Sequence, residues 1–152
     1  ADAFTPVGQG MIPTGEILPV EGTPMDFRAA KSIGADIEAD YEQLKIAGGY
    51  DHNYVLNNSN GTLRKIAEVS EPESGRRMEV FSDAVGVQFY AGNFVESIPK
   101  GKEGVVYQKR SGLCLETQGF PDATHHEMFP STVLRAGAKY ETTTIYYFSA
   151  VK

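Results

Sequence analysis

The chain has 152 residues, of which 41% are hydrophobic and 22% are charged. This composition is ordinary for a globular protein, and the length is enough for a hydrophobic core. The formal net charge of -6 disfavours phosphate-rich surfaces, so we expect neither nucleic acid nor a membrane as a partner. We assign residues 1–152 to one domain.

Cys114 is the only cysteine, which excludes an internal disulfide bond and leaves the cellular compartment open. No apolar run approaches the roughly 20 residues of a membrane-spanning helix, and no signal-peptide pattern is visible. We expect a cytoplasmic protein, with an exported or periplasmic one as the alternative. Because the sequence starts with alanine, we expect either a removed leader or a cut before Ala1.

Proline is frequent in the first 28 residues, where we predict loops and short extended pieces instead of a helix. The next segment contains the one helix that we predict, over residues 36–44. From residue 52 onward, apolar and polar residues alternate in short runs, and turn residues separate the runs.

Successive side chains of a strand point to opposite faces, so each run predicts which residues share a face. For residues 63–69 the alternation predicts one face for Leu63, Lys65, Ala67 and Val69. Similar runs are "HNYVLNN", "RRMEVFSDA", "GVQFYAGNF" and "YETTTIYYFSA". This pattern is typical of an antiparallel all-β sandwich or barrel.

Glu116 lies in the stretch "GLCLETQGFPDA", where apolar Leu113 and Leu115 alternate with other residues. The alternation places Glu116 on the same strand face as Cys114 and Gln118, opposite the leucines. A carboxylate in a partly dry cleft has a raised proton affinity and can accept a proton near neutral pH. On this pattern Glu116 is either a general base or a solubilising surface residue.

Asp51 and Gln88 also stand where neighbouring strands can bring polar groups together. Asp51 opens its strand after Gly48 and Gly49, which permit a close backbone approach or unusual dihedral angles. Gln88 faces away from the aliphatic side of its strand. Carboxylates and amides bond to sugar hydroxyls, and aromatic rings cover the apolar face of a pyranose, so this set predicts a sugar site. The plain alternative is a turn residue and a solvated residue.

Histidines are the other candidates for chemistry. His125 and His126 are adjacent, so on an extended chain they point in opposite directions and do not chelate one metal ion together. No second ligand cluster has metal-site spacing, so we expect no metal. We predict a structural hydrogen bond for His52 and a packed thiol for Cys114.

Four segments, in this order along the chain, resemble the aldose 1-epimerase family, the galactose mutarotases. They are "ADAFTPVGQGMIPTGEILPVEGTPMDFR", "GGYDHNYVL", "GVQFYAGNF" and "CLETQGFPDATHHEMFPSTVLRAGAKYETTTIYYF". The resemblance runs from residue 1 to the C-terminus. It implies an all-β, antiparallel β-sandwich of the galactose mutarotase type, of which this chain is the C-terminal part.

Within this resemblance, Glu116 matches the general base that removes the proton from the C1 hydroxyl. Asp51 matches the aspartate that holds sugar hydroxyls, and Gln88 matches a glutamine that lines the site. The implied reaction interconverts the α and β anomers of hexoses such as galactose and glucose, with no metal or organic cofactor. The family's general acid is a histidine in its N-terminal half, and no histidine of this chain matches it.

Three functional hypotheses are therefore open, and each has a small-molecule sugar as the partner. The first is a mutarotase, and the second is a non-catalytic carbohydrate-binding or interaction domain of the same fold. A glycosidase with Asp51 and Glu116 as paired carboxylates ranks last. A half-sandwich would leave strand edges unpaired, so we also expect self-association or a missing N-terminal half.

Overall fold

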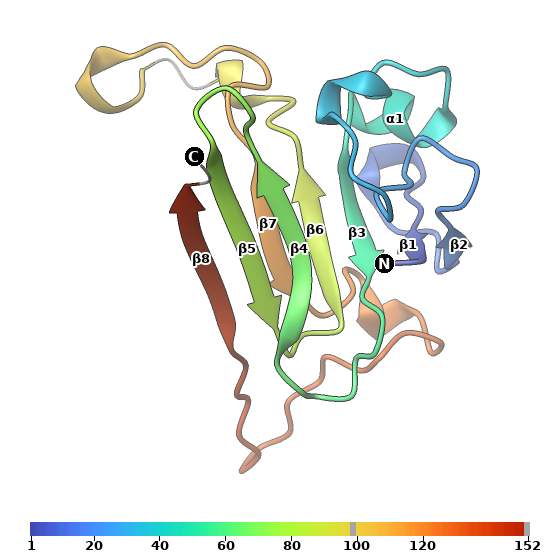
Figure 1. The fold of residues 1–152 in the computed structure, drawn as a ribbon. Helices are drawn as coiled ribbons and strands as arrows, with labels where there is room; N and C mark the ends of the chain where they lie inside the picture. Colours follow the sequence, from blue (N-terminus) through green and yellow to red (C-terminus); the bar gives the residue numbers. More distant parts are fainter. Residues whose placement is uncertain (98–99, 151–152) are drawn as a thin grey trace.

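The computed structural model describes residues 1–97 and 100–150, which form two antiparallel sheets (Figure 1). The larger sheet has the order β2-β1-β3-β6-β7, and the smaller sheet has the order β4-β5-β8. The strands are β1 (Ala3–Thr5), β2 (Leu18–Pro19), β3 (Asp51–Val55), β4 (Arg64–Ser70), β5 (Arg76–Ser82), β6 (Gly86–Tyr90), β7 (Cys114–Gln118) and β8 (Thr144–Ala150). The prediction of an antiparallel all-β fold is confirmed.

One face of the larger sheet is apolar and forms the core. Strand pairing aligns Phe4, Tyr54 and Val87 across β1, β3 and β6, and Phe89 lies beside them in the same buried cluster. Ile66 of β4 packs against this cluster, so the smaller sheet lies over the apolar face and the two sheets form a sandwich. Each large apolar side chain that is fully buried contributes about 1.5–3 kcal/mol relative to exposure.

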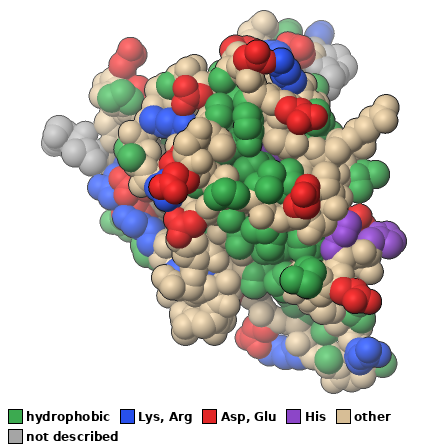
Figure 2. Space-filling view, turned by 90° about the vertical axis from the view of Figure 1, so that its right-hand side faces the viewer, with side chains coloured by type: hydrophobic (Ala, Val, Ile, Leu, Met, Phe, Trp, Pro, Cys, Tyr) green, Lys and Arg blue, Asp and Glu red, His purple; other side chains and the backbone are tan. Residues whose placement is uncertain are grey.

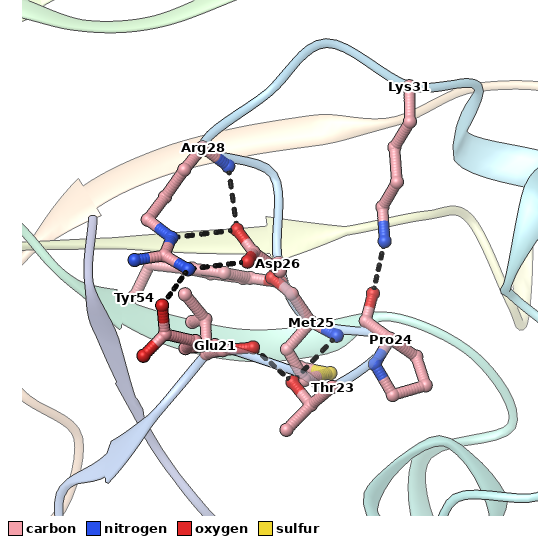
Figure 3. Close-up of polar contacts among 9 residues, drawn as sticks. Glu21, Thr23, Pro24, Met25, Asp26, Arg28, Lys31 and Tyr54 are labelled. Atoms are coloured by element: carbon pink, nitrogen blue, oxygen red, sulfur yellow. Dashed lines mark hydrogen bonds and ion pairs between the residues drawn. The ribbon is translucent and has the colours of Figure 1, made fainter.

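The segment of residues 20–31 covers part of this core, since Val20 and Met25 are buried in it and Phe27 packs against it. Figure 3 shows the polar contacts of this segment. Met25 is fully buried, and the Tyr54 hydroxyl of β3 donates to the Met25 carbonyl at 3.1 Å. Arg28 binds the Asp26 carboxylate through two nitrogen atoms at 3.0 and 2.8 Å, and these bonds lower the pKa of Asp26 to about 2. The segment therefore lacks regular secondary structure, but these contacts hold its backbone against the core.

Apolar surface also remains open to solvent. Figure 2 shows hydrophobic side chains gathered across the middle of one face, with acidic side chains around them. An opening of about 710 Å³ between the apolar sheet face and β4 is lined in part by Phe27, Leu56 and Ile66. On β8, Tyr147 and Phe148 are 56% and 71% exposed. Among the described residues, the sandwich is thus incompletely closed.

The helix α1 spans Glu42–Ala47, so the predicted helix over residues 36–44 is placed too early. Residues 36–40 form turns and bends, and Tyr41 has extended φ and ψ of -128° and 128°, which delays the helix. Short 3-10 turns lie at Gln9–Met11, Ile33–Ala35, Val95–Ser97, Lys102–Gly104 and Ala123–His125. No helix in residues 1–97 and 100–150 is long and apolar enough to cross a membrane.

A β-bulge in β4 overturns the shared face predicted for the odd-numbered positions of residues 63–69. Lys65 pairs with Phe81 of β5, whereas Ala67 pairs with Val80, the preceding residue. Because Val80 and Phe81 point to opposite faces, so do Lys65 and Ala67. The alternation of β4 could not reveal this, since a bulge is defined by the partner strand.

His52 lies on the apolar face of the larger sheet and is fully buried. Its ring packs edge-on against Phe4, with 5.9 Å between the centroids, and its Nδ1 accepts a hydrogen bond from the Asp51 backbone N–H at 3.1 Å. The predicted structural hydrogen bond is confirmed. Within residues 1–97 and 100–150, the Nε2 atom has no hydrogen-bond partner. Burial lowers the pKa of His52 from 6.5 to about 4, because a charged ring would lose its hydration.

We expect His52 to make the protein less stable as the pH falls from about 6.5 to about 4. In this window the unfolded chain binds a proton that the folded chain excludes, so about 3 kcal/mol of unfolding free energy, present above pH 6.5, is lost. Urea denaturation across this range should show a smaller loss in His52→Asn, which keeps an acceptor but cannot titrate. His125→Asn, at an exposed histidine, should follow the wild type. Parallel curves for wild type and His52→Asn would contradict this assignment.

Candidate functional site

The polar face of the larger sheet carries a row of side chains across β3, β6 and β7. The register pairs Asn53 with Gln88, and Gln88 with Glu116. Residues directly opposite one another on antiparallel strands project to the same face, so these three side chains stand side by side. The alternation that turns Phe89 toward the core therefore turns this row outward.

Asp51 joins the row through a hydrogen bond, because Gln88 Nε2 donates to Asp51 Oδ1 at 2.8 Å. Asp51 and Gln88 are half-buried, whereas Glu116 is exposed. The structure thus brings the three residues singled out in the sequence to one face of neighbouring strands. Their chemical roles remain predictions.

A hollow of about 140 Å³ lies over this face. Its lining residues come from strands and loops: Thr5, Val7, Met11, Pro13, Asp51, Asn53, Gln88 and Pro121. Glu116 is outside this lining and stands next to Gln88 at the side of the hollow. Ligand pockets commonly measure roughly 300–1,000 Å³, so this hollow is smaller than a typical pocket.

Contacts from α1 and from the loop after β7 support the surroundings of the hollow. Gln43 of α1 accepts a hydrogen bond from the Val7 N–H at 2.7 Å and donates to the Val7 carbonyl at 2.9 Å. Gln43 is buried, so it satisfies backbone groups that water does not reach. Phe120 and Phe129 pack edge to face at 5.2 Å and, together with Val55, cover one end of the polar face.

The double glycine before Asp51 is required by the geometry of the turn. Gly49 has φ of 139°, and a Cβ atom there would lie 2.2 Å from Asn93 Oδ1. Asn93 is buried, and its Nδ2 donates to the carbonyls of Ala47 and Tyr50 at 3.2 and 3.0 Å. This amide ties the end of α1 to the start of β3 and so places Asp51. The predicted close approach and unusual dihedral angle are confirmed.

Thr5, Asn53 and Gln118 also belong to the polar face, although the sequence did not single them out as site residues. Gln118 Nε2 donates to Gln88 Oε1 and to Asn53 Oδ1, both at 3.2 Å. Alternation placed Gln118 on the face of Glu116, and the same spacing of two residues links Asn53 to Asp51. That spacing was the available signal, but it does not identify hydrogen-bond partners.

Cys114 is exposed, which corrects the expectation of a packed thiol. It pairs with Tyr90 on the polar face, two residues from Glu116 along β7. Partial burial and the carboxylate of Glu116 raise the pKa of the thiol. A thiol that keeps its proton is a weak nucleophile, so we assign Cys114 no part in the chemistry.

The adjacent histidines share one carboxylate in the loop after β7. His125 Nδ1 contacts Asp122 Oδ1, and His126 Nε2 lies 3.4 Å from Asp122 Oδ2. The His126 ring also lies 5.1 Å from that of Phe129. In the described parts of the chain, no group of three or more histidine, cysteine or acidic residues is placed to hold a metal ion. The contacts of the pair are therefore those of a structured loop.

Fold and site together define a β-sandwich protein that presents carboxylate and amide groups on an open sheet face. Such groups suit a ligand rich in hydroxyls. The chain belongs to the aldose 1-epimerase family, whose sequence model matches residues 1–147. The resemblance drawn from four sequence segments is thereby confirmed.

Relatives and solved structures agree with this assignment. Galactose mutarotase of Mus musculus is 46% identical over 149 residues, which cover 98% of this chain and 42% of the mouse protein. Aldose 1-epimerase of Escherichia coli K12 is 36% identical over 153 residues, with 99% and 43% covered. A C. elegans aldose epimerase homologue matches with a TM-score of 0.77 at 28% identity, over 100% of this chain and 44% of that one. The chain spans less than half the length of these relatives.

We expect Gly49→Ala to lower the free energy of unfolding by about 2 kcal/mol or more, since the new methyl group meets Asn93 at a strained dihedral angle. Gly61→Ala is the matched control, because Gly61 has φ of 78° with open space around it. It should cost about 1 kcal/mol from the backbone alone. Urea denaturation measures both variants, and equal losses would show that Asn93 does not restrict this turn.

Proposed function

We propose that the protein carrying this sequence is an aldose 1-epimerase that interconverts the α and β anomers of hexoses such as galactose and glucose. The observation that carries this proposal is the placement of Glu116 beside Gln88 and Asp51 on one sheet face, in a member of this family. The names of the mouse and E. coli relatives, galactose mutarotase and aldose 1-epimerase, support the choice of reaction.

Glu116 acts as the general base in this proposal. It is exposed at the side of the hollow, where the C1 hydroxyl of a bound sugar can reach it. Its neighbour across the strands, Gln88, lines the hollow itself. A sugar held over Gln88 therefore places its reacting end next to the carboxylate.

Asp51 and Gln88 hold the sugar by hydrogen bonds. One Asp51 oxygen accepts the Gln88 amide, and the carboxylate has further lone pairs that can accept sugar hydroxyls. The Gln88 NH2 group carries a second hydrogen that can reach a sugar oxygen. This division gives Asp51 and Gln88 the binding role and Glu116 the proton transfer.

The reaction needs two coupled proton transfers. Glu116 removes the proton from the C1 hydroxyl while an acid protonates the ring oxygen, so the C1–O5 bond breaks and the open aldehyde forms. Rotation about C1–C2 presents the other aldehyde face, and O5 attacks it as the two proton transfers run in reverse. Each positioned proton transfer typically accelerates such a reaction by about 10²–10⁴-fold.

In this scheme, none of the three histidines of this chain is the general acid. His52 faces the core, on the opposite side of β3 from Asp51, and is fully buried. His125 and His126 are engaged with Asp122. We therefore expect the acid, a histidine by resemblance to the family, outside these 152 residues, of which 149 align with 42% of the mouse relative.

The test is polarimetry of freshly dissolved α-galactose or α-glucose with the natural protein at its full length. We expect Glu116→Gln to slow catalysed mutarotation by about 10²–10⁴-fold, because an amide cannot accept the proton. Sugar binding should persist, since Asp51 and Gln88 are intact. Saturation-transfer NMR with the same sugar measures that binding.

Glu127→Gln serves as the control, because Glu127 is exposed in the loop after β7. It should leave the rate unchanged. Full activity in Glu116→Gln would remove Glu116 as the base. Binding of hexose by the wild type with no acceleration would instead favour the alternative function, a non-catalytic carbohydrate-binding or interaction domain.

A further inference from the structure

We propose that Gln118 is a positioning residue of this site, which fixes the amide orientation of Gln88 and, through it, the carboxylate of Asp51. The inference rests on the proposed function, because it explains how the sugar-binding pair is held. Gln118 sits two residues after Glu116 on β7, and its amide lies between those of Asn53 and Gln88.

Four side chains form a continuous row of hydrogen bonds, which Thr5 extends at one end. Asn53 Nδ2 lies 3.4 Å from Thr5 Oγ1, and Gln118 Nε2 lies 3.2 Å from Asn53 Oδ1. The same Gln118 nitrogen lies 3.2 Å from Gln88 Oε1, and Gln88 Nε2 lies 2.8 Å from Asp51 Oδ1. We call the side chains of Asn53, Gln118, Gln88 and Asp51 the amide row. None of these bonds involves Glu116.

At the Asn53 end of the amide row, two long contacts with Thr5 favour one direction of donation. The Thr5 hydroxyl donates to the Asn53 backbone carbonyl at 3.5 Å, so its oxygen accepts from the Asn53 side chain. Asn53 then turns its NH2 group toward Thr5 and its oxygen toward Gln118. Gln118 must then donate from its own NH2 group, because two carbonyl oxygens cannot form a hydrogen bond with each other.

The Asp51 end requires the same direction independently. An ionised carboxylate only accepts hydrogen bonds, so Gln88 must turn its NH2 group to Asp51 and its oxygen to Gln118. Gln118 is thus the one residue on which both constraints meet, and its NH2 group serves two acceptors at once. A donor at position 118 satisfies both ends, and an acceptor satisfies neither.

The Asn53 side chain is enclosed by its neighbours, so its amide can hold the rest of the amide row in one orientation. Asn53 is 2% exposed. A Cβ atom at Gly86 would come within 2.3 Å of Asn53 Oδ1, so glycine at this position makes room for the amide. Gln88 and Asp51 also line the hollow, as Asn53 does, but they are only half-buried. The fixed inner amide therefore orients the outer groups that meet the ligand.

The decisive variant is Gln118→Glu, which keeps the side-chain length but replaces the donor with an acceptor. In this variant Gln88 lies between two carboxylates, and its NH2 group cannot face both, so we expect the amide to turn away from Asp51 in part of the molecules. The KM for the hexose should rise about tenfold, while kcat changes less than about twofold, because binding is lost without loss of the base. Gln118→Met, which neither donates nor accepts strongly, should raise KM only about two- to threefold.

NMR of the same proteins reads the amide directly, with or without sugar. In the wild type, the Gln88 NH2 protons should show Overhauser contacts to the Asp51 β-protons. In Gln118→Glu these contacts should weaken, and contacts with the γ-protons at position 118 should appear. Gln108→Glu is the charge control, because Gln108 is exposed in a loop, and it should behave as wild type in every measurement.

The possible results separate this inference from the proposed function. Unchanged KM and unchanged Gln88 contacts in folded Gln118→Glu would overturn the positioning role, even if mutarotation is normal. A lower kcat together with a lower Tm, with KM unchanged, would mark Gln118 as merely structural. A wild type that neither binds nor converts hexose would refute the proposed function, and the positioning role for sugar would fall with it.

Discussion

The register of β3, β6 and β7 is the constraint on which the rest of this structure depends. It places Asn53, Gln88 and Glu116 in line on one face and Phe89 on the other. A shift of one residue in any of these strands would exchange the faces, burying carboxylates and exposing the core. Burial of the apolar side chains on one face therefore also fixes the position of the polar side chains on the other face, although these are not part of the core.

Buried side-chain amides then hold the loops around this sheet. Gln43 binds both backbone groups of Val7, and Asn93 binds the carbonyls of Ala47 and Tyr50. Each amide replaces the water that a surface loop would use for its backbone. Val7, which lines the hollow, is thus held to α1, and the end of α1 is held to the start of β3, by short polar contacts.

Much of this could be predicted from the sequence, because alternation is a local property. The face of Glu116, the outward face of Gln88 and the strained turn before Asp51 all follow from spacing and residue type. The bulge in β4 did not, since it arises from pairing with β5. The exposure of Cys114 and the partners of Gln118 likewise depend on neighbouring strands. The sequence alone assigns residues to the faces of a strand, whereas their partners on neighbouring strands follow only from the pairing register.

The strand that carries Glu116 lies at one edge of the larger sheet among the described residues, and an edge strand pairs with a neighbour on one side only. Here β8 of the smaller sheet steadies it: the Tyr146 hydroxyl donates to the Leu115 carbonyl at 2.6 Å, and the Thr117 and Thr144 hydroxyls lie 2.5 Å apart. These contacts bind the residues on either side of Glu116 and leave its side chain exposed. A proposed base needs this combination, because its backbone must be fixed while its carboxylate stays accessible to the proton that it removes.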